Sequence, residues 1–460
     1  YSRKEFDYEE EEGDGIPEKK SKQLTIEKVL RNVGGGRRAH KEIRSSLMQM
    51  LAVDKMPLST PNNAGTIAAR DVAKDSHTGE FIFDTIDDVL VKYKVLDKVV
   101  AAVRDGAGNV KLAGKLIRVP HWDCLSHKLN LACKAGIKAL IGLDALIAKY
   151  KKIIRKLNKS TLARLELERI QELLDIPILH LVKANEVWWN YLVDMFERAL
   201  RVKPALSLLL GKNTNYPQLE ETDWELMQTT IDLLTPVKRA TMFSQDRAMT
   251  ASTILPLMKI VIKELNGMTD FVVASKAIVD KLEEEQAKYV GNEFLVLATA
   301  TDPRFKVAFA PDFAKDLLIN TLLSSKKTPN IAVAQTETSV PCDNPFSRFL
   351  LDKLQVPPRT AIELDAEISI KQEVEKWILS PPNPELDPFQ FWTNPVNEAT
   401  FPHIGSIAPV YLCAPPSSAE SERMFSHAGN ILRDNRKSLS ADHFEKLLFL
   451  TINIPQMGFS

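Results

Sequence analysis

The strongest constraint on the fold is a long stretch, from residue 140 to about 320, in which apolar side chains recur every three or four residues. That spacing is typical of amphipathic helices that turn one face toward a core. Six segments show it: 143–157, 162–174, 188–210, 224–242, 253–265 and 271–289. We therefore predict an all-helical domain over residues 136–386, with a polar, flexible segment at 324–345 inside it.

The region just before these helices has a different pattern. The apolar run Val99–Val103 predicts a strand that is buried on both faces, and it ends at Asp105, before a glycine-containing loop. A second strand is predicted at 116–122, and an amphipathic helix is predicted to begin at Thr78. This mixture predicts an α+β fold that is mostly α.

Farther upstream the sequence carries weaker signals. Residues 1–39 combine an acidic run with several lysines, a composition that predicts a disordered tail. Residues 40–76 are predicted to hold a short helix, with Ile43, Leu47, Met50 and Leu51 on one face, followed by a loop.

The net charge of the chain is zero and therefore does not indicate a nucleic-acid partner. Lys and Arg total 60, as do Asp and Glu, so any DNA binding must come from a local patch. Four scattered cysteines form no disulfide framework and fit a reducing compartment. No apolar run reaches membrane-spanning length, so we expect a nuclear or cytosolic protein without a membrane partner.

The densest motif lies near the C-terminus, in PPSSAESERMFSHAGNILRDNRKSLSADHFEKLLFLTIN at residues 415–453. Ser417 and Ser418 are suitable caps for a helix that begins with two glutamates, and Gly429-Asn430 predicts its end. A basic connector follows and then a second helix with an apolar stripe. The connector contains Arg433, Arg436 and Lys437, and the stripe contains Phe444, Leu447 and Leu448. The connector is either a phosphate-contacting loop or a solvated one.

This segment resembles the C-terminal region of hAT-family transposases. There a Ser-Glu-Arg helix holds a catalytic acid, and the next helix helps subunits dimerise. The run VVAAVRDGAGN is similar to the hAT segment with the second acid of an RNase H-like triad. The resemblance therefore implies that Asp105 is the second acid, Glu422 the third, and the stripe of Phe444, Leu447 and Leu448 a dimerisation surface.

The resemblance also implies a fold. We expect a truncated RNase H-like core, formed by residues 77–135 and part of the C-terminal segment and interrupted by the large helical insertion. Residues 387–454 would form the hAT dimerisation region that completes the core. Asp105 has a simpler alternative, since an Asp before glycine also organises a tight Asx turn.

The first acid of the triad has no counterpart. The family places it on the first strand, before Trp-Thr, and no such string occurs here. The chain passes from Pro57-Leu58-Ser59 to His77-Thr78 in under twenty residues, too few for three strands. We expect these strands, the first acid and the zinc-bearing BED finger that commonly precedes the fold to be missing. Two carboxylates are a thin ligand set for two Mg²⁺ ions, so no bound cofactor is expected, and Asp105 and Glu422 would hold Mg²⁺ only in an active enzyme.

Three further motifs suggest other roles. Cys124 and His127 form a C-x-x-H pair without the second pair that structural zinc needs. Their surroundings resemble a family string near the active site, which implies that His127 helps to position DNA. Trp188-Trp189-Asn190 resembles a family string whose Trp stacks on a flipped base, although a paired Trp is as often core. Asp302 is expected to cap a helix without a catalytic role.

Together these features predict a transposase-derived, domesticated and catalytically inactive nuclear protein. It would pair with itself through the C-terminal region, could contact DNA, and would have no small-molecule substrate. Two alternatives remain open. One is an active, metal-dependent DNA transposase known here from an incomplete gene model, and the other is a helical protein-interaction scaffold without a DNA role.

Overall fold

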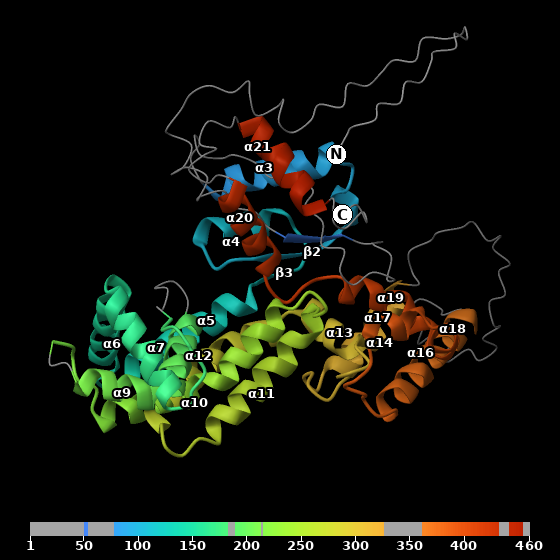
Figure 1. The fold of residues 1–460 in the computed structure, drawn as a ribbon. Helices are drawn as coiled ribbons and strands as arrows, with labels where there is room; N and C mark the ends of the chain where they lie inside the picture. The colour runs from blue at the N-terminus through green and yellow to red at the C-terminus, as the bar shows by residue number, and fades with distance from the viewer. Residues whose placement is uncertain are drawn as a thin grey trace, which may run out of the picture.

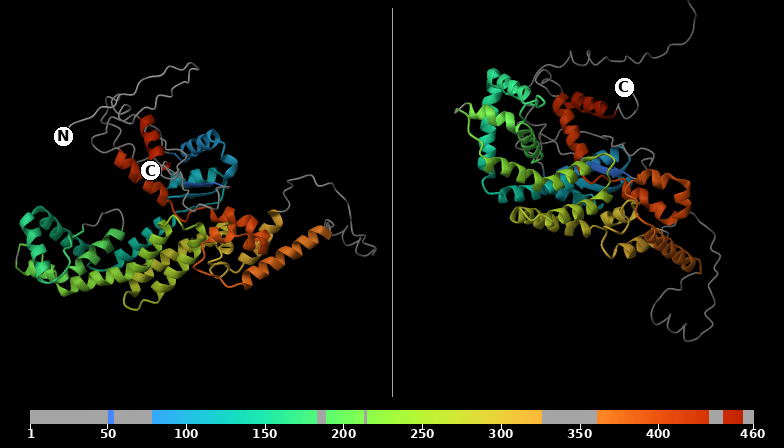
Figure 2. Two further views of the ribbon diagram at one scale, coloured as in Figure 1. Left: turned by 45° about the vertical axis from the view of Figure 1, so that its right-hand side comes forward. Right: turned by 60° about the horizontal axis from the view of Figure 1, so that its bottom comes forward.

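The computed structural model describes residues 50–53, 78–182, 189–212, 215–325, 361–431 and 441–453. Within these ranges a small β-sheet with a few covering helices lies on one side of a long helical assembly (Figures 1 and 2). The fold is therefore α+β and mostly α, as predicted. The described helices include none that joins the length and the apolarity needed to cross a lipid bilayer.

The sheet has three strands in the described residues, in the order β1 (Met50–Val53), β2 (Val99–Arg104) and β3 (His121–Asp123). β1 runs antiparallel to β2, and β3 runs parallel to it. The central strand β2 is buried at every residue except Val100, which is half-buried. The apolar run that predicted a strand covered on both faces therefore forms one.

Three helices surround the sheet. α3 (Gly79–Lys92) begins where predicted, because the Thr78 hydroxyl accepts a hydrogen bond from the Phe81 amide. α4 (Gly108–Leu116) connects β2 to β3, and α5 (Leu125–Ala139) follows β3 directly. The 3₁₀ turn η2 (Leu96–Lys98) leads into β2.

Two predicted elements are corrected near the sheet. The second strand begins later than residue 116, because Leu116 completes α4 and Arg118 turns the chain with a φ of 58°. The short helix predicted to include Met50 and Leu51 is wrong at that end, since both residues belong to β1. A short apolar run suits either element, and pairing with β2 decides between them. Residues 40–49 and 54–76 lie outside the described ranges, as do residues 1–39.

The helical assembly follows the predicted periodicity closely. Its helices are α6 (Leu143–Lys159), α7 (Thr161–Leu173), α8 (Asn190–Arg201), α9 (Lys203–Gly211), α10 (Glu221–Gln245), α11 (Ile254–Asn266), α12 (Val272–Val290), α13 (Glu293–Thr301), α14 (Ala314–Ser325) and α16 (Ala361–Leu379), with the 3₁₀ turn η3 (Ala251–Thr253) before α11. The single helix predicted over 188–210 is instead two, because Pro204 starts a new helix at α9. Most of the segment predicted to be flexible at 324–345 lies outside the described residues.

The Pro- and aromatic-rich segment after α16 is not an irregular connector. It forms α17 (Pro388–Thr393), α18 (Pro395–Thr400) and α19 (Pro402–Leu412), each with proline in its first turn. Asp387 and Asn394 cap the first two, since their side-chain oxygens accept backbone amides. The chain closes with α20 (Ala419–Ile431) and α21 (Ala441–Asn453), which lie on the same side of the helical assembly as the sheet (Figures 1 and 2).

A separate apolar core joins α16 to the short helices and to α13. Trp377 is fully buried there, and its Nε1 donates a hydrogen bond of 2.8 Å to the carbonyl of Ala300. Lys306 closes the C-terminal end of α16, because its Nζ donates to the carbonyls of Trp377 and Ser380 and lies 4.2 Å from the Trp377 ring centroid. Burial lowers the pKa of Lys306 to about 8, whereas these oxygen acceptors favour the ammonium form.

We predict that Trp377→Ala strongly destabilises the protein. Removing a fully buried indole typically costs about 3–5 kcal/mol, through lost apolar burial and the cavity that remains. Denaturant unfolding of the whole chain measures the loss. Leu379→Ala, two residues along the same helix at an 82% exposed position, is the matched control and is expected to change stability by less than about 0.5 kcal/mol. Similar losses for both variants would show that Trp377 does not anchor this core.

Candidate functional site

The start of α20 is bonded into the junction between the sheet and the helical assembly. The amide of Ser418 donates to the Cys124 sulfur, 3.3 Å away, and the Ser417 hydroxyl donates to the carbonyl of Ser244 at 2.6 Å. All four residues are buried. Cys124 lies at the start of α5, and Ser244 lies at the end of α10. The start of α20 therefore packs beside the start of α5 and the end of α10.

The Ser-Glu-Arg string at residues 421–423 contacts two different parts of the structure: Arg423 contacts the end of α10, and Glu422 contacts α5. Arg423 bonds to Glu420 and to the carbonyl of Gln245, and Arg247 holds the same Glu420 carboxylate with two nitrogens, at 2.9 and 3.1 Å. Such bidentate pairs fix orientation as well as position. The arrangement fastens the first turn of α20 to the end of α10.

Glu422 turns toward α5 and meets His127. Its Oε1 lies 3.8 Å from Nδ1 of His127, and each side chain is about one-third exposed. Burial raises the pKa of Glu422, and the nearby His127 partly opposes that shift. Two of the predicted site residues are therefore brought together, in a setting that favours a protonated carboxyl more than a solvent-exposed site would.

Asp105 lies where predicted, directly after β2, but its carboxylate forms a local turn. Its Oδ1 accepts a hydrogen bond of 3.1 Å from the amide of Ala107. This is the Asx turn that was the simpler expectation for an Asp before glycine. Asp105 therefore lies at the end of the predicted strand, and one of its carboxylate oxygens already accepts a hydrogen bond within the turn.

A metal ion needs a set of ligand side chains, and the described residues can be compared with that set. Across the described ranges, no three side chains of His, Cys, Asp or Glu gather as a set able to hold a metal ion. Asp105, His127 and Glu422 therefore do not make one ligand group, and a two-Mg²⁺ site needs several carboxylate oxygens. The Cys124 thiol is buried and its pKa is raised by burial, so it packs at the start of α5 rather than presenting a thiolate.

A different carboxylate, Asp123, is the electrostatic centre of the sheet edge. It ends β3, and it pairs with Arg104, with Lys128 at 2.7 Å and with Lys111 at 3.5 Å. Lys128 also pairs with Glu285 of α12 at 3.1 Å. Sequence reasoning missed this cluster, which we call the Asp123 network, because Glu285 lies far away along the chain.

Apart from Lys111, the side chains of the Asp123 network are largely buried, so each of these charges is stable only while its oppositely charged partners are present. Arg104 and Lys128 are less than a tenth exposed. Burial lowers the pKa of Arg104, and the charge of Asp105 partly opposes the shift. Tyr289 adds a further link, because its hydroxyl donates to the backbone carbonyl of Asp123 at 2.8 Å. The network therefore connects the sheet to α12 through charged and neutral hydrogen bonds.

Other predicted residues lie in the core or outside the described ranges. Trp189 is the N-cap residue of α8 and is only 5% exposed within the main helical core, so its ring is not presented for base stacking. Asp302 is fully buried and bonds to Arg304 and Ser252. Asp302 is the C-cap residue of α13, so it does cap a helix, at the C-terminal end, and a turn follows it. Trp188, Arg433, Arg436 and Lys437 lie outside the described residues.

The apolar stripe of α21 has a partner within its own chain. Phe444 and Leu448 are buried against α20, where they contact Met424, Ala428 and Ile431, and Leu447 packs at the edge. α20 also runs on through Gly429 and Asn430 to Ile431, so the predicted helix end at those residues is wrong. The two helices form one packed unit, and Leu450 is 46% exposed on it.

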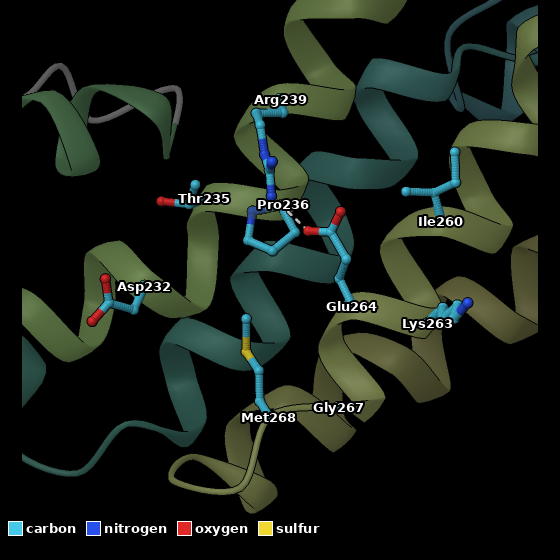
Figure 3. A pocket seen from close by; sticks show the side chains of 9 residues that line it. All are labelled: Asp232, Thr235, Pro236, Arg239, Ile260, Lys263, Glu264, Gly267 and Met268. Atoms are coloured by element: carbon cyan, nitrogen blue, oxygen red, sulfur yellow. Dashed lines mark hydrogen bonds and ion pairs between the residues drawn. The ribbon is translucent and has the colours of Figure 1, made fainter. Parts of the chain in front are cut away.

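A pocket of about 700 Å³ lies elsewhere, between α10 and α11 (Figure 3). Pro236, Ile260 and Met268 line it, and Arg239 pairs with Glu264 at 2.6 Å across its wall. None of the predicted site residues lines this pocket, so it is not part of the candidate site.

Comparisons with known proteins show what the chain is similar to. The hAT family C-terminal dimerisation region matches residues 369–454. The human protein named zinc finger BED domain-containing protein 4 is 24% identical over 354 residues, or 73% of this chain and 29% of its own length. The mouse zinc finger BED domain-containing protein 6 is 22% identical, covering 78% and 40%. A maize protein named putative AC transposase is 23% identical, covering 81% and 50%.

Residues 369–454 therefore match the hAT family dimerisation region, and most of the chain is similar to two zinc finger BED proteins and to a protein named a putative transposase. This confirms the resemblance recognised in the sequence. The matched region begins at residue 369, inside α16, earlier than the predicted boundary at 387. The chain spans half or less of the length of the curated relatives reported above.

We predict that Asp123→Asn destabilises the fold by about 3–5 kcal/mol, because it leaves the buried cations Arg104 and Lys128 without their shared carboxylate. Asp105→Asn is the matched control at the end of the neighbouring strand. An amide oxygen can still accept the Ala107 amide, so a change below about 0.5 kcal/mol is expected. Denaturant unfolding compares the two. Equal effects would mean that the Asp123 network does not hold the sheet edge.

Proposed function

We propose that this protein is a transposase derivative without DNA-cutting activity, which self-associates through its hAT dimerisation region and contacts DNA in the nucleus. The observation that carries the proposal is the match of that region to residues 369–454, where α20 and α21 pack as one unit beside the sheet. The resemblance of most of the chain to two zinc finger BED proteins and a transposase supports a DNA-associated, nuclear role.

The local chemistry supports the loss of DNA cutting. Phosphoryl transfer with two Mg²⁺ ions needs ionised carboxylates that share the metals. One oxygen of Asp105 accepts a backbone amide, and Glu422 has a raised pKa and faces His127. One oxygen of Asp105 is thus engaged in a turn, and the sequence has no counterpart of the first acid of the triad.

The α20–α21 unit supports self-association. Because Phe444 and Leu448 pack inside the unit, a surface for a second copy must come from its outer side. Leu450 is exposed there, on a helix that lies within the matched dimerisation region. In this proposal the buried stripe shapes the surface and Leu450 forms part of the contact itself.

We therefore predict that Leu450→Glu shifts the full-length chain toward monomer, with at least a tenfold weaker dimerisation, since a carboxylate in an apolar contact is costly to desolvate. Light scattering over a range of protein concentrations measures this. Leu173→Glu, at a 70% exposed position on α7, is the control and should leave the oligomeric state unchanged.

A second variant separates contact from folding. Leu448→Glu places a charge between α20 and α21 and is expected to reduce both helicity and self-association, whereas Leu450→Glu keeps the helicity. A dimer that persists in Leu450→Glu would contradict the proposed outer surface. A wild-type chain that stays monomeric at all concentrations would contradict self-association altogether.

We also predict that the purified chain, incubated with Mg²⁺ and supercoiled plasmid, produces no nicked product on an agarose gel. Asp105→Ala and Glu422→Ala should behave the same as the wild type. Nicking that either substitution abolishes would overturn the proposed inactivity and favour an active transposase. A chain with no affinity for duplex DNA even at low salt would instead favour a protein-interaction scaffold.

A further inference from the structure

Helix α6 concentrates positive charge in a chain whose overall charge is zero. Six of its 17 residues are Lys or Arg, and Asp144 in the first turn is its one acidic residue. α12 offers a contrast, because its three lysines share the helix with four acidic residues and pair with some of them. The charge of α12 is thus balanced along its own surface, and that of α6 is not.

Among the α6 cations, Lys149 and Lys156 bond to the start of α10 and to the segment before it. Lys149 pairs with Asp223 at 2.6 Å, at the start of α10. Lys156 donates to the carbonyl of Asn215 and lies 5.5 Å from the ring centroid of Tyr216. These contacts hold the segment before α10 against α6, so both side chains are already engaged.

Three other cations lie on the side of the helix that is opposite its buried face. Lys152, Arg155 and Lys159 are exposed and follow one another at spacings of three and four residues, which places them on one face. The buried face of α6 carries Leu146, Tyr150, Ile153, Ile154 and Leu157. We call Lys152, Arg155 and Lys159 the α6 basic stripe.

The stripe is free to meet an external anion. Among the described residues, no carboxylate forms an ion pair with any of the three side chains, and the one recorded bond is from Arg155 Nε to the carbonyl of Lys151 in the same helix. At 1.5 Å of rise per residue, the three charges span about 10 Å along the axis. α6 stands at the end of the helical assembly opposite α16 (Figures 1 and 2).

We propose that the α6 basic stripe is a phosphate-contacting surface for duplex DNA. Duplex DNA presents a regular array with about one negative charge per 1.7 Å of axis, so a rigid row of three cations can contact several phosphates at once. Proteins that hold single strands usually add aromatic side chains for stacking, and the single aromatic residue of α6, Tyr150, is fully buried. The stripe therefore fits a duplex backbone better than an unpaired strand.

This inference rests on the proposed DNA contact and assigns it to a particular surface. The test measures binding of the full chain to a fluorescent duplex oligonucleotide, by anisotropy, at several salt concentrations. The variant Lys152→Gln/Arg155→Gln/Lys159→Gln removes the stripe. The control, Lys259→Gln/Lys263→Gln/Lys276→Gln, removes the same charge from exposed positions on α11 and α12.

The stripe variant is expected to bind at least about tenfold more weakly, with a salt dependence reduced by about 2 to 3 in slope, since each lost phosphate contact contributes about 0.9. The control should change affinity less than about twofold. Lys152→Arg/Lys159→Arg keeps the charges and should bind like the wild type, and circular dichroism checks that all variants remain folded.

Two results would overturn the assignment while leaving the proposed DNA contact intact. One is a stripe variant that binds DNA as tightly as the control. The other is a conservative Lys-to-Arg variant that loses as much affinity as the Gln variant. Tighter binding to duplex RNA or to a single strand would overturn the choice of duplex DNA. A wild-type chain that binds no duplex at low salt would remove both the surface and the proposed DNA contact.

Discussion

The ion pair between Asp123 and its buried cations is the interaction on which the arrangement of this molecule depends. The sheet is small, with six residues in its longest described strand, so it cannot bury much apolar surface by itself. Asp123 joins Arg104 of the same sheet to Lys128 of α5, and Lys128 in turn reaches Glu285 of α12. Buried charges of this kind are stable only as a complete set. The sheet and the helical assembly are therefore held in one relative position.

The C-terminal segment uses that fixed junction. Ser417 and Ser418 bond to the end of α10 and the start of α5, and Glu420 is held by Arg247. α20 is thus placed by residues from two distant parts of the chain, and α21 is placed by α20 through Phe444 and Leu448. Within the hAT dimerisation region, α20 contacts the junction directly, and α21 packs on α20 and carries the exposed Leu450.

Sequence reasoning succeeded where a local pattern was sufficient. The run Val99–Val103 predicts β2 because five apolar residues in succession need cover on both faces, and Thr78 predicts the start of α3 through its capping hydroxyl. It failed where distant pairing decides, as for β1, whose apolar residues become a strand only beside β2. It also missed the partners of Asp123, since no local spacing relates Lys128 to Glu285. Two of the three proline-started helices, α17 and α18, were within reach, because Asp387 and Asn394 each precede a proline in a capping pattern.

The hydrogen bonds from Lys306 to the C-terminal end of α16 bear on whether the dimerisation region can be stable by itself. Residue 369, where that region begins, lies in the middle of α16, and Trp377 a little farther on is enclosed partly by α13 and α14. A fragment cut at residue 369 would lose the ammonium that satisfies the last carbonyls of this helix and would bare an indole to water. The dimerisation region therefore does not fold independently of the residues before it. Residues of α13, α14 and Lys306 stabilise its first helix, so self-association depends on the stability of the helical assembly.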